Sequence, residues 1–149
     1  MPRILRLVIA AFVGLVVGSV VNMGLIVVGG NVIPSPTGLD VTTTEGLNAS
    51  MHLFEPKHFL FPFLAHALGT LAGAMVATRL APERARGPAW AVGALFLLGG
   101  IASVAMLPAP AWFSAADLLL AYLPMAWLGH RLMSPRAAAA RPEAPVGIA

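Results

Sequence analysis

The chain has 149 residues, of which 58% are hydrophobic and only 10% are charged. A soluble domain carries about 25% charged residues, so ordinary cytosolic, disordered and collagen-like classes are excluded. The chain contains no cysteine, which excludes disulfides, thiolate metal sites and thiol nucleophiles. Its net charge of +3 would indicate nucleic-acid binding only if the positive charge formed one face. It does not, so no nucleic-acid partner is expected.

Long apolar segments account for most of the chain. Each is long enough to cross the ~30 Å hydrocarbon layer of a bilayer at ~1.5 Å per residue, and helices satisfy the backbone polar groups there. The first exceeds the apolar core of a secretory signal, about 7–15 residues, which favours an uncleaved span. The sequence therefore predicts an all-α polytopic membrane protein, an up-down bundle of four transmembrane helices in one domain over residues 1–133. The expected spans are about 4–29, 57–79, 88–107 and 111–132.

Basic residues predict how the chain is threaded, because Lys and Arg are retained on the cytoplasmic side. One side of the predicted bundle has only Lys57 together with Asp40, Glu45 and Glu55. Both termini are therefore expected in the cytoplasm, and the Ala- and Arg-rich, Lys-poor composition favours a bacterial inner membrane. The other eight basic residues lie on the opposite side: Arg3, Arg6, Arg79, Arg84, Arg86, Arg131, Arg136 and Arg141.

Two segments lie outside the predicted spans. In the outer loop, residues 30–56, Thr43 or Thr44 is placed to cap a short helix. Leu47, Met51 and Phe54 would give that helix one apolar face, suited to the membrane surface. The tail, residues 134–149, is rich in Ala, Pro and Arg without apolar periodicity, which is typical of a disordered cytoplasmic extension.

Small residues recur every four positions on the first two spans. Lipid removes the hydrophobic force between helices, so close van der Waals contact at small residues holds them together. The first and second spans are therefore expected to form a tight antiparallel pair, although Gly and Ala are also simply common in membrane helices. Pro62, Pro124 and the pair Gly99-Gly100 are expected to kink or loosen their spans. The two rows are Ala10, Gly14, Gly18 and Asn22, and Ala65, Gly69, Gly73 and Ala77.

Three polar side chains are expected at one level in the outer half of the bundle, each about 9–12 Å from the outer end of its helix. They are Asn22, His66 and Asp117. Such groups are costly in lipid and are candidates for function, so we expect a shared polar pocket that exchanges a proton near neutral pH. The alternative is a structural hydrogen-bond cluster. Thr70 and Ser114 complete the predicted pocket, whereas Tyr122, about 140° from Asp117 on a continuous helix, is expected elsewhere.

A divalent metal ion is the one cofactor that the sequence raises. His52, Glu55 and His58 lie near the outer entrance, and imidazole and carboxylate are ligands for Zn²⁺ or Cu²⁺. The alternative is that Pro56 starts the second helix, with Glu55 at its positive end. A di-iron site is excluded because only one Glu-x-x-His motif is present.

No nucleotide-binding, metalloprotease or serine-hydrolase motif is present. We therefore expect a small membrane protein that binds or transports a proton, metal ion or small polar solute through the pocket. Two alternatives remain: a membrane-embedded enzyme with His66 and Asp117 as acid and base, and a non-catalytic accessory subunit. Besides the lipid bilayer, the expected partners are a second copy of the chain or a larger membrane protein.

Overall fold

The computed structural model describes residues 1–107 and 109–134, which are helical and contain no strand. Short 3₁₀ turns at Met51–Leu53, Pro56–Phe59 and Pro82–Arg84 connect the helices. Most of the predicted tail, residues 135–149, lies outside the described residues. The helices are α1 (Arg3–Val32), α2 (Thr44–Ser50), α3 (Leu60–Leu80), α4 (Gly87–Met106), α5 (Ala111–Leu120) and α6 (Leu123–Met133).

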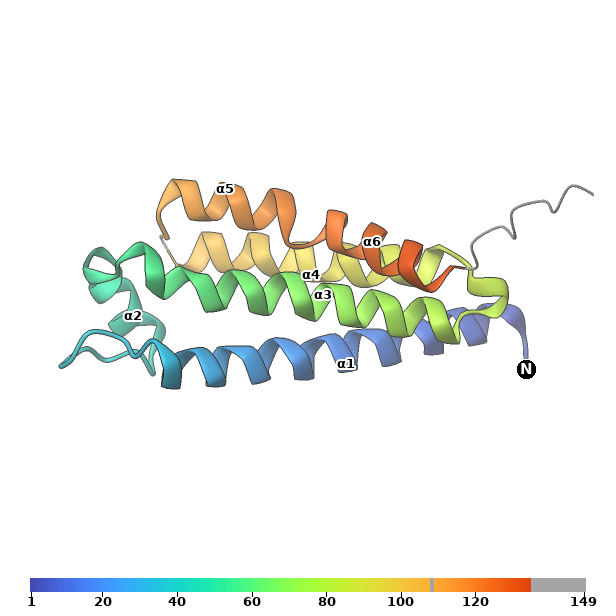
Figure 1. Cartoon of the computed structure of the whole chain (residues 1–149), viewed down its shortest axis with the longest axis horizontal. Helices are drawn as coiled ribbons and strands as arrows, with labels where there is room; N and C mark the ends of the chain where they lie inside the picture. Colours follow the sequence, from blue (N-terminus) through green and yellow to red (C-terminus); the bar gives the residue numbers. More distant parts are fainter. Residues whose placement is uncertain (108, 135–149) are drawn as a thin grey trace, which may run out of the picture.

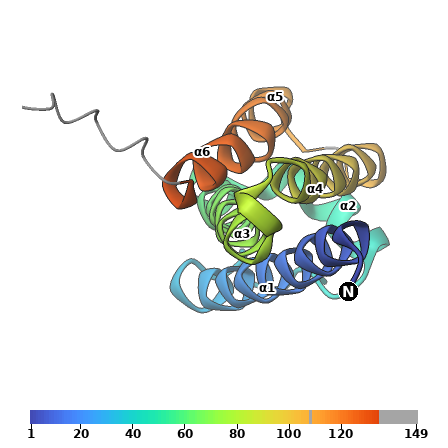
Figure 2. The ribbon, with the colours of Figure 1, turned by 90° about the vertical axis from the view of Figure 1, so that its right-hand side faces the viewer.

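The long helices lie side by side along the long axis of the molecule, with α3 in the middle (Figures 1 and 2). On one side of α3 lies α1, and on the others lie α4 and the consecutive helices α5 and α6. We call the end that carries α2 and residues 33–59 the loop end. The end that carries Arg3, residues 81–86 and Met133 is the terminal end (Figure 1).

The distribution of side chains is the reverse of that in a water-soluble protein. The buried residues are mainly small, such as Ala65, Ala74 and Thr70, whereas large apolar side chains such as Phe12 and Leu98 are exposed. Water would expel these large side chains into a core, but lipid is as apolar as they are. Among the described residues, four helical segments are long and apolar enough to cross a membrane, as in a multi-pass membrane protein. They are Arg3–Val32, Pro56–Leu80, Gly87–Met106 and Ala111–Met133.

The small residues of α1 and α3 bring the two backbones into contact. A Cβ atom added at Gly14 would lie 2.5 Å from the carbonyl oxygen of Gly73, and one added at Gly18 would lie 2.7 Å from that of Gly69. Ala10 and Ala77 are likewise fully buried. The structure thus places the two rows of small residues against each other, which fixes α1 against the helix that carries His66.

The fourth apolar segment is divided in two, as Figure 1 shows. α5 ends at Leu120 and α6 begins at Leu123. Pro124 explains the break, because proline lacks an N–H and its ring clashes with the carbonyl four residues earlier, here that of Leu120. Tyr122, in the break, has φ −114° and ψ −82°. The break expected from Pro124 therefore lies two to three residues before it.

The other expected weak points leave their helices regular. Pro62 lies in the first turn of α3, where an N–H has no helical partner to lose. Gly99 and Gly100 lie within α4, which is continuous from Gly87 to Met106. The expected kinks at these positions are therefore wrong, and Gly100 has a different role, described below.

The contact between α1 and α3 predicts that Gly14→Ala destabilises the protein by about 1–3 kcal/mol, because the added methyl group has no space. Gly24→Ala is the matched control, since a Cβ at Gly24 meets no atom within 4 Å. That control is expected to be neutral or slightly stabilising. Unfolding of the purified protein in detergent measures both changes, and equal stabilities of the two variants would contradict the packing.

Candidate functional site

A histidine and a carboxylate meet inside the bundle. His66 lies in the second turn of α3, and Asp117 lies on α5 with only 2% of its surface exposed. His66 Nδ1 lies 2.9 Å from each carboxylate oxygen of Asp117. An unpaired acid at this depth would be costly, so a proton on Nδ1, shared with the carboxylate, stabilises the arrangement. The structure thus brings together two of the predicted pocket residues.

Tyr122 is the third member of this cluster, and its predicted placement elsewhere is wrong. Its hydroxyl donates a hydrogen bond of 2.7 Å to Asp117 Oδ2 and lies 3.0 Å from His66 Nδ1. The two rings are stacked, with centroids 5.7 Å apart. The expected angle between Asp117 and Tyr122 assumed one continuous helix. The break before Pro124 changes the direction of the chain at Tyr122 and turns its side chain toward His66.

Gly100 provides the space that Tyr122 occupies. A Cβ atom at Gly100 would lie only 2.5 Å from the Tyr122 hydroxyl oxygen, whereas one at the neighbouring Gly99 would meet no atom within 4 Å. α4 can therefore approach the Tyr122 hydroxyl closely because Gly100 has no side chain there. The Gly-Gly pair was the only signal in the sequence for this role, and it fits a helix weak point equally well.

The remaining predicted pocket residues surround the cluster without joining it. Thr70 is fully buried, and its hydroxyl donates to the backbone carbonyl of His66 at 2.7 Å. Asn22 packs against Gly69, and its Oδ1 is buried without a hydrogen-bond partner among the described residues. Ser114 is half-buried and makes no hydrogen bond to His66 or Asp117. The described cluster therefore consists of His66, Asp117 and Tyr122.

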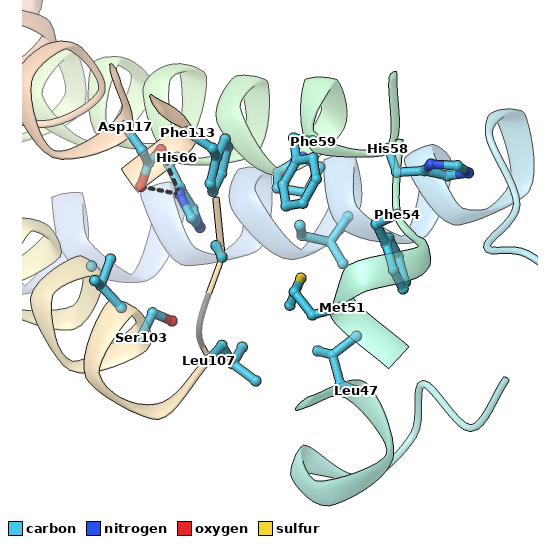
Figure 3. A pocket seen from close by; sticks show the side chains of 15 residues that line it. Leu47, Met51, Phe54, His58, Phe59, His66, Ser103, Leu107, Phe113 and Asp117 are labelled. Atoms are coloured by element: carbon cyan, nitrogen blue, oxygen red, sulfur yellow. Dashed lines mark hydrogen bonds and ion pairs between the residues drawn. The ribbon is translucent and has the colours of Figure 1, made fainter. Parts of the chain in front are cut away.

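A cavity of about 300 Å³ lies beside His66 and Asp117 on the loop side. Figure 3 shows the imidazole of His66 directed into this space, with Asp117 behind it. His66 Nε2 has no hydrogen-bond partner among the described residues. Apart from His66, Asp117, His58 and Ser103 the lining is apolar: Ile26, Leu47, Met51, Phe54, Phe59, Pro62, Gly100, Val104, Leu107, Ala109 and Phe113. We call this space the His66 cavity.

The short helix expected in the outer loop is present as α2, and it covers the His66 cavity. Thr43 caps α2 by accepting a hydrogen bond of 3.1 Å from the Gly46 N–H. Asn48 Nδ2 donates to the carbonyl of Met106, at the end of α4, at 3.0 Å. The helix is shorter than expected: α2 ends at Ser50, so Leu47 lies on it, Met51 lies in the following 3₁₀ turn, and Phe54 lies just beyond that turn. All three side chains line the cavity on its loop side (Figure 3).

Asp40 orders the segment that leads into α2. Its carboxylate accepts hydrogen bonds from the Thr42 N–H and from the hydroxyls of Thr42 and Thr43 at 2.7 to 2.9 Å. Because these bonds favour the ionised form, they lower the pKa of Asp40 to about 2. The anchor of this loop therefore stays charged at physiological pH.

Two aromatic rings separate the His66 cavity from a second hollow on the side of the bundle. Phe59 and Phe113 have ring centroids 4.9 Å apart and line both spaces. The second hollow, of about 370 Å³, is bordered by the exposed side chains of Leu60 and Trp112. These two rings are thus shared by the cavity and by a hollow on the apolar outer surface.

The structure does not gather His52, Glu55 and His58 into the possible metal site. Among the described residues, no group of three or more His, Asp or Glu side chains could hold a metal ion. His58 Nδ1 accepts a hydrogen bond of 3.0 Å from the Glu55 N–H, and the Glu55 carboxylate lies 3.1 Å from Lys57 Nζ. Glu55 and His58 form a capping box around the turn that Pro56 begins, while His52 is exposed. Glu55 and His58 therefore cap the start of a helix at Pro56, as the alternative interpretation predicts for Pro56 and Glu55.

Comparison with other proteins adds no relative. No protein family model matches the chain, and neither the curated proteins nor the solved structures give a match. The functional argument therefore depends on the geometry of the cluster and its cavity.

The cluster predicts a measurable role for the Tyr122 hydroxyl. Tyr122→Phe removes one hydrogen bond from the buried Asp117 carboxylate and is expected to lower the free energy of unfolding by about 1–3 kcal/mol. In an Asp117→Asn background the same change should cost at least about 0.5 kcal/mol less, because the two groups are coupled. A double-mutant cycle in detergent measures this coupling, and additive effects would contradict the hydrogen bond.

Gly100→Ala displaces the same hydroxyl without removing it, and Gly99→Ala on the same helix is its control. Tyr122 is the only tyrosine of the chain, so the tyrosine Raman doublet reports the hydrogen bonding of this one phenol. The doublet should change in Gly100→Ala and stay as in the wild type in Gly99→Ala. An unchanged doublet in both variants would show that Gly100 does not hold the Tyr122 position.

Proposed function

We propose that the chain is a multi-pass protein of a bacterial inner membrane, an up-down bundle with both termini in the cytoplasm. The charges of the two ends support this threading, since cytoplasmic ends retain Lys and Arg. The loop end carries Lys57 and three acids, Asp40, Glu45 and Glu55, whereas the terminal end has Glu83, paired with Arg3 at 3.2 Å. The described basic residues of the terminal end are Arg3, Arg6, Arg79, Arg84, Arg86 and Arg131.

This threading predicts which introduced thiols react on intact cells. The chain has no cysteine, so each single substitution gives one reactive site. A membrane-impermeant maleimide should label Thr37→Cys, at the loop end, on intact cells. It should label Glu83→Cys, at the terminal end, only after the cells are permeabilised. The reverse pattern would contradict the orientation.

Within this framework we propose that the protein binds a small lipid-soluble ligand that has an apolar body and one hydrogen-bonding group. The observation that carries the proposal is a cavity of about 300 Å³ whose lining is mostly apolar and includes the hydrogen-bonded pair of His66 and Asp117. Such a site resembles ligand pockets in general, which are mostly apolar with a few placed polar groups. The polar group of the ligand would lie at His66 Nε2.

The apolar walls favour this ligand over the metal ion or small polar solute considered from sequence. A hydrated ion would lose its water against Phe54, Phe59 and Phe113 and recover contacts only at the few polar side chains of a mostly apolar lining, and desolvation of an ion is costly. A largely apolar molecule loses little on entering the same space. A route from the bilayer would pass Phe59 and Phe113, which line both the cavity and the outer hollow.

A pair of probes of nearly equal shape tests the proposal. 4-Propylphenol has an apolar body and one hydroxyl, and propylbenzene lacks the hydroxyl. We expect both to raise the unfolding temperature of the purified protein in detergent, and the phenol to bind about fivefold more tightly, since one net hydrogen bond contributes about 1 kcal/mol.

His66→Ala should remove the difference between the probes while propylbenzene still binds. The control His52→Ala changes an exposed histidine that does not line the cavity and should keep the difference. Equal binding of the two probes to the wild type, or a difference that survives in His66→Ala, would contradict a ligand headgroup at His66.

A second candidate is a membrane enzyme in which His66 Nε2 acts as a general base. The observation that favours it is that Asp117 holds Nδ1 and leaves Nε2 accessible, the arrangement that orients a catalytic imidazole. Mass spectrometry of molecules that co-purify with the wild type and with Asp117→Asn distinguishes the two. An enzyme would yield chemically different molecules, substrate in the variant and product in the wild type, whereas a binding protein would yield the same molecule.

A further inference from the structure

A second cluster of functional groups lies at the terminal end, far along the bundle from His66. A cavity of about 350 Å³ opens there between the start of α4 and the end of α6. Its lining combines two guanidinium groups, two indoles, an imidazole and a hydroxyl, and it contains no carboxylate. The lining residues are Arg86, Trp90, Trp127, His130, Arg131 and Ser134. We call this cavity the Arg86–Arg131 site.

The positive charge of this site is not neutralised by the described part of the chain. Neither Arg86 nor Arg131 forms an ion pair with any described carboxylate, and Glu83, the one acid among the described residues of this end, is paired with Arg3. Arg131 instead lies over the Trp127 ring, 5.1 Å from its centroid. A cation on an aromatic face keeps its outer N–H groups free to donate. The site therefore presents the donor groups of two arginines to an anion.

Neighbouring contacts hold the polar members in place. The Ser134 hydroxyl donates to the His130 carbonyl at 2.8 Å and lies 3.1 Å from His130 Nε2. Arg84 donates to the Met133 carbonyl at 2.6 Å, which ties the segment before α4 to the end of α6. Arg86, which immediately precedes α4, and Arg131, on α6, both line this cavity.

The indoles indicate the environment of the anion. Trp90 and Trp127 are 41% and 47% exposed, and indoles favour the headgroup level of a bilayer. A free anion in water would gain nothing from these two exposed rings, whereas a lipid would place its acyl chains along them and its phosphate at the arginines. Basic pockets between helices on the cytoplasmic side are suited to anionic headgroups.

We propose that the Arg86–Arg131 site binds the phosphate of an anionic phospholipid from the cytoplasmic leaflet. The two guanidinium groups donate to the phosphate oxygens, and the Trp90 and Trp127 rings pack against the glycerol and the first acyl carbons. This inference uses the proposed membrane location but is independent of any ligand in the His66 cavity.

The test is native mass spectrometry of the full-length protein with phosphatidylglycerol or phosphatidylcholine of identical acyl chains. We expect the wild type to retain phosphatidylglycerol in preference. The double variant Arg86→Gln/Arg131→Gln should bind phosphatidylglycerol on the order of 25-fold more weakly, since each arginine near a lipid surface contributes about fivefold. The double variant Arg6→Gln/Arg79→Gln loses the same charge outside the cavity and should keep the preference.

Three outcomes would overturn the proposal: equal retention of the two lipids by the wild type, equal losses in the two double variants, or displacement of phosphatidylglycerol by millimolar inorganic phosphate that itself stays bound. The last would assign the site to a free anion. The Arg86→Gln/Arg131→Gln variant should still distinguish 4-propylphenol from propylbenzene. A result against lipid binding at the Arg86–Arg131 site can thereby be told apart from a result against ligand binding in the His66 cavity.

Discussion

A buried carboxylate in a bundle with almost no other polar side chains must be paired, and the pairing of Asp117 organises the loop half of this structure. An acid in the middle of a membrane helix costs roughly 2.5–3.5 kcal/mol on an insertion scale. Here His66 from α3 and Tyr122 from the break before α6 share that carboxylate. Three helical segments are thereby held at one point, and Gly100 of α4 leaves room for the phenol.

The small-residue contacts and the polar cluster hold different pairs of helices together. Gly14 and Gly73 bring α1 and α3 into backbone contact, while Asp117 and Tyr122 attach the other side of α3 to α5 and α6. α3 therefore presents His66 from a position fixed on both faces. Because Leu47, Met51 and Phe54 of the outer loop line the cavity next to it, the fixed imidazole meets a mostly apolar space, which is the basis of the proposed ligand class.

Periodicity and composition were sufficient for the all-helical class, the four apolar segments and the facing rows of Gly14 and Gly73. They also placed His66 and Asp117 at one level. Tyr122 was missed because its direction depends on a break whose position and angle a continuous helical projection does not contain. The possible metal site shows a related ambiguity: the spacing of Glu55 and His58 fits a capping box as well as a ligand pair, and the structure shows the capping box. The cavity arises from side chains of five segments and has no local sequence pattern.

The central claim is that His66 and Asp117 are directly hydrogen-bonded inside the bundle. Solid-state NMR of the protein in lipid, with ¹⁵N-labelled histidine and ¹³C-labelled aspartate, measures the dipolar coupling between His66 Nδ1 and the Asp117 carboxyl carbon. We expect a weak but resolvable coupling, because Nδ1 lies 2.9 Å from each carboxylate oxygen. The absence of a resolvable coupling between these two nuclei would contradict the account.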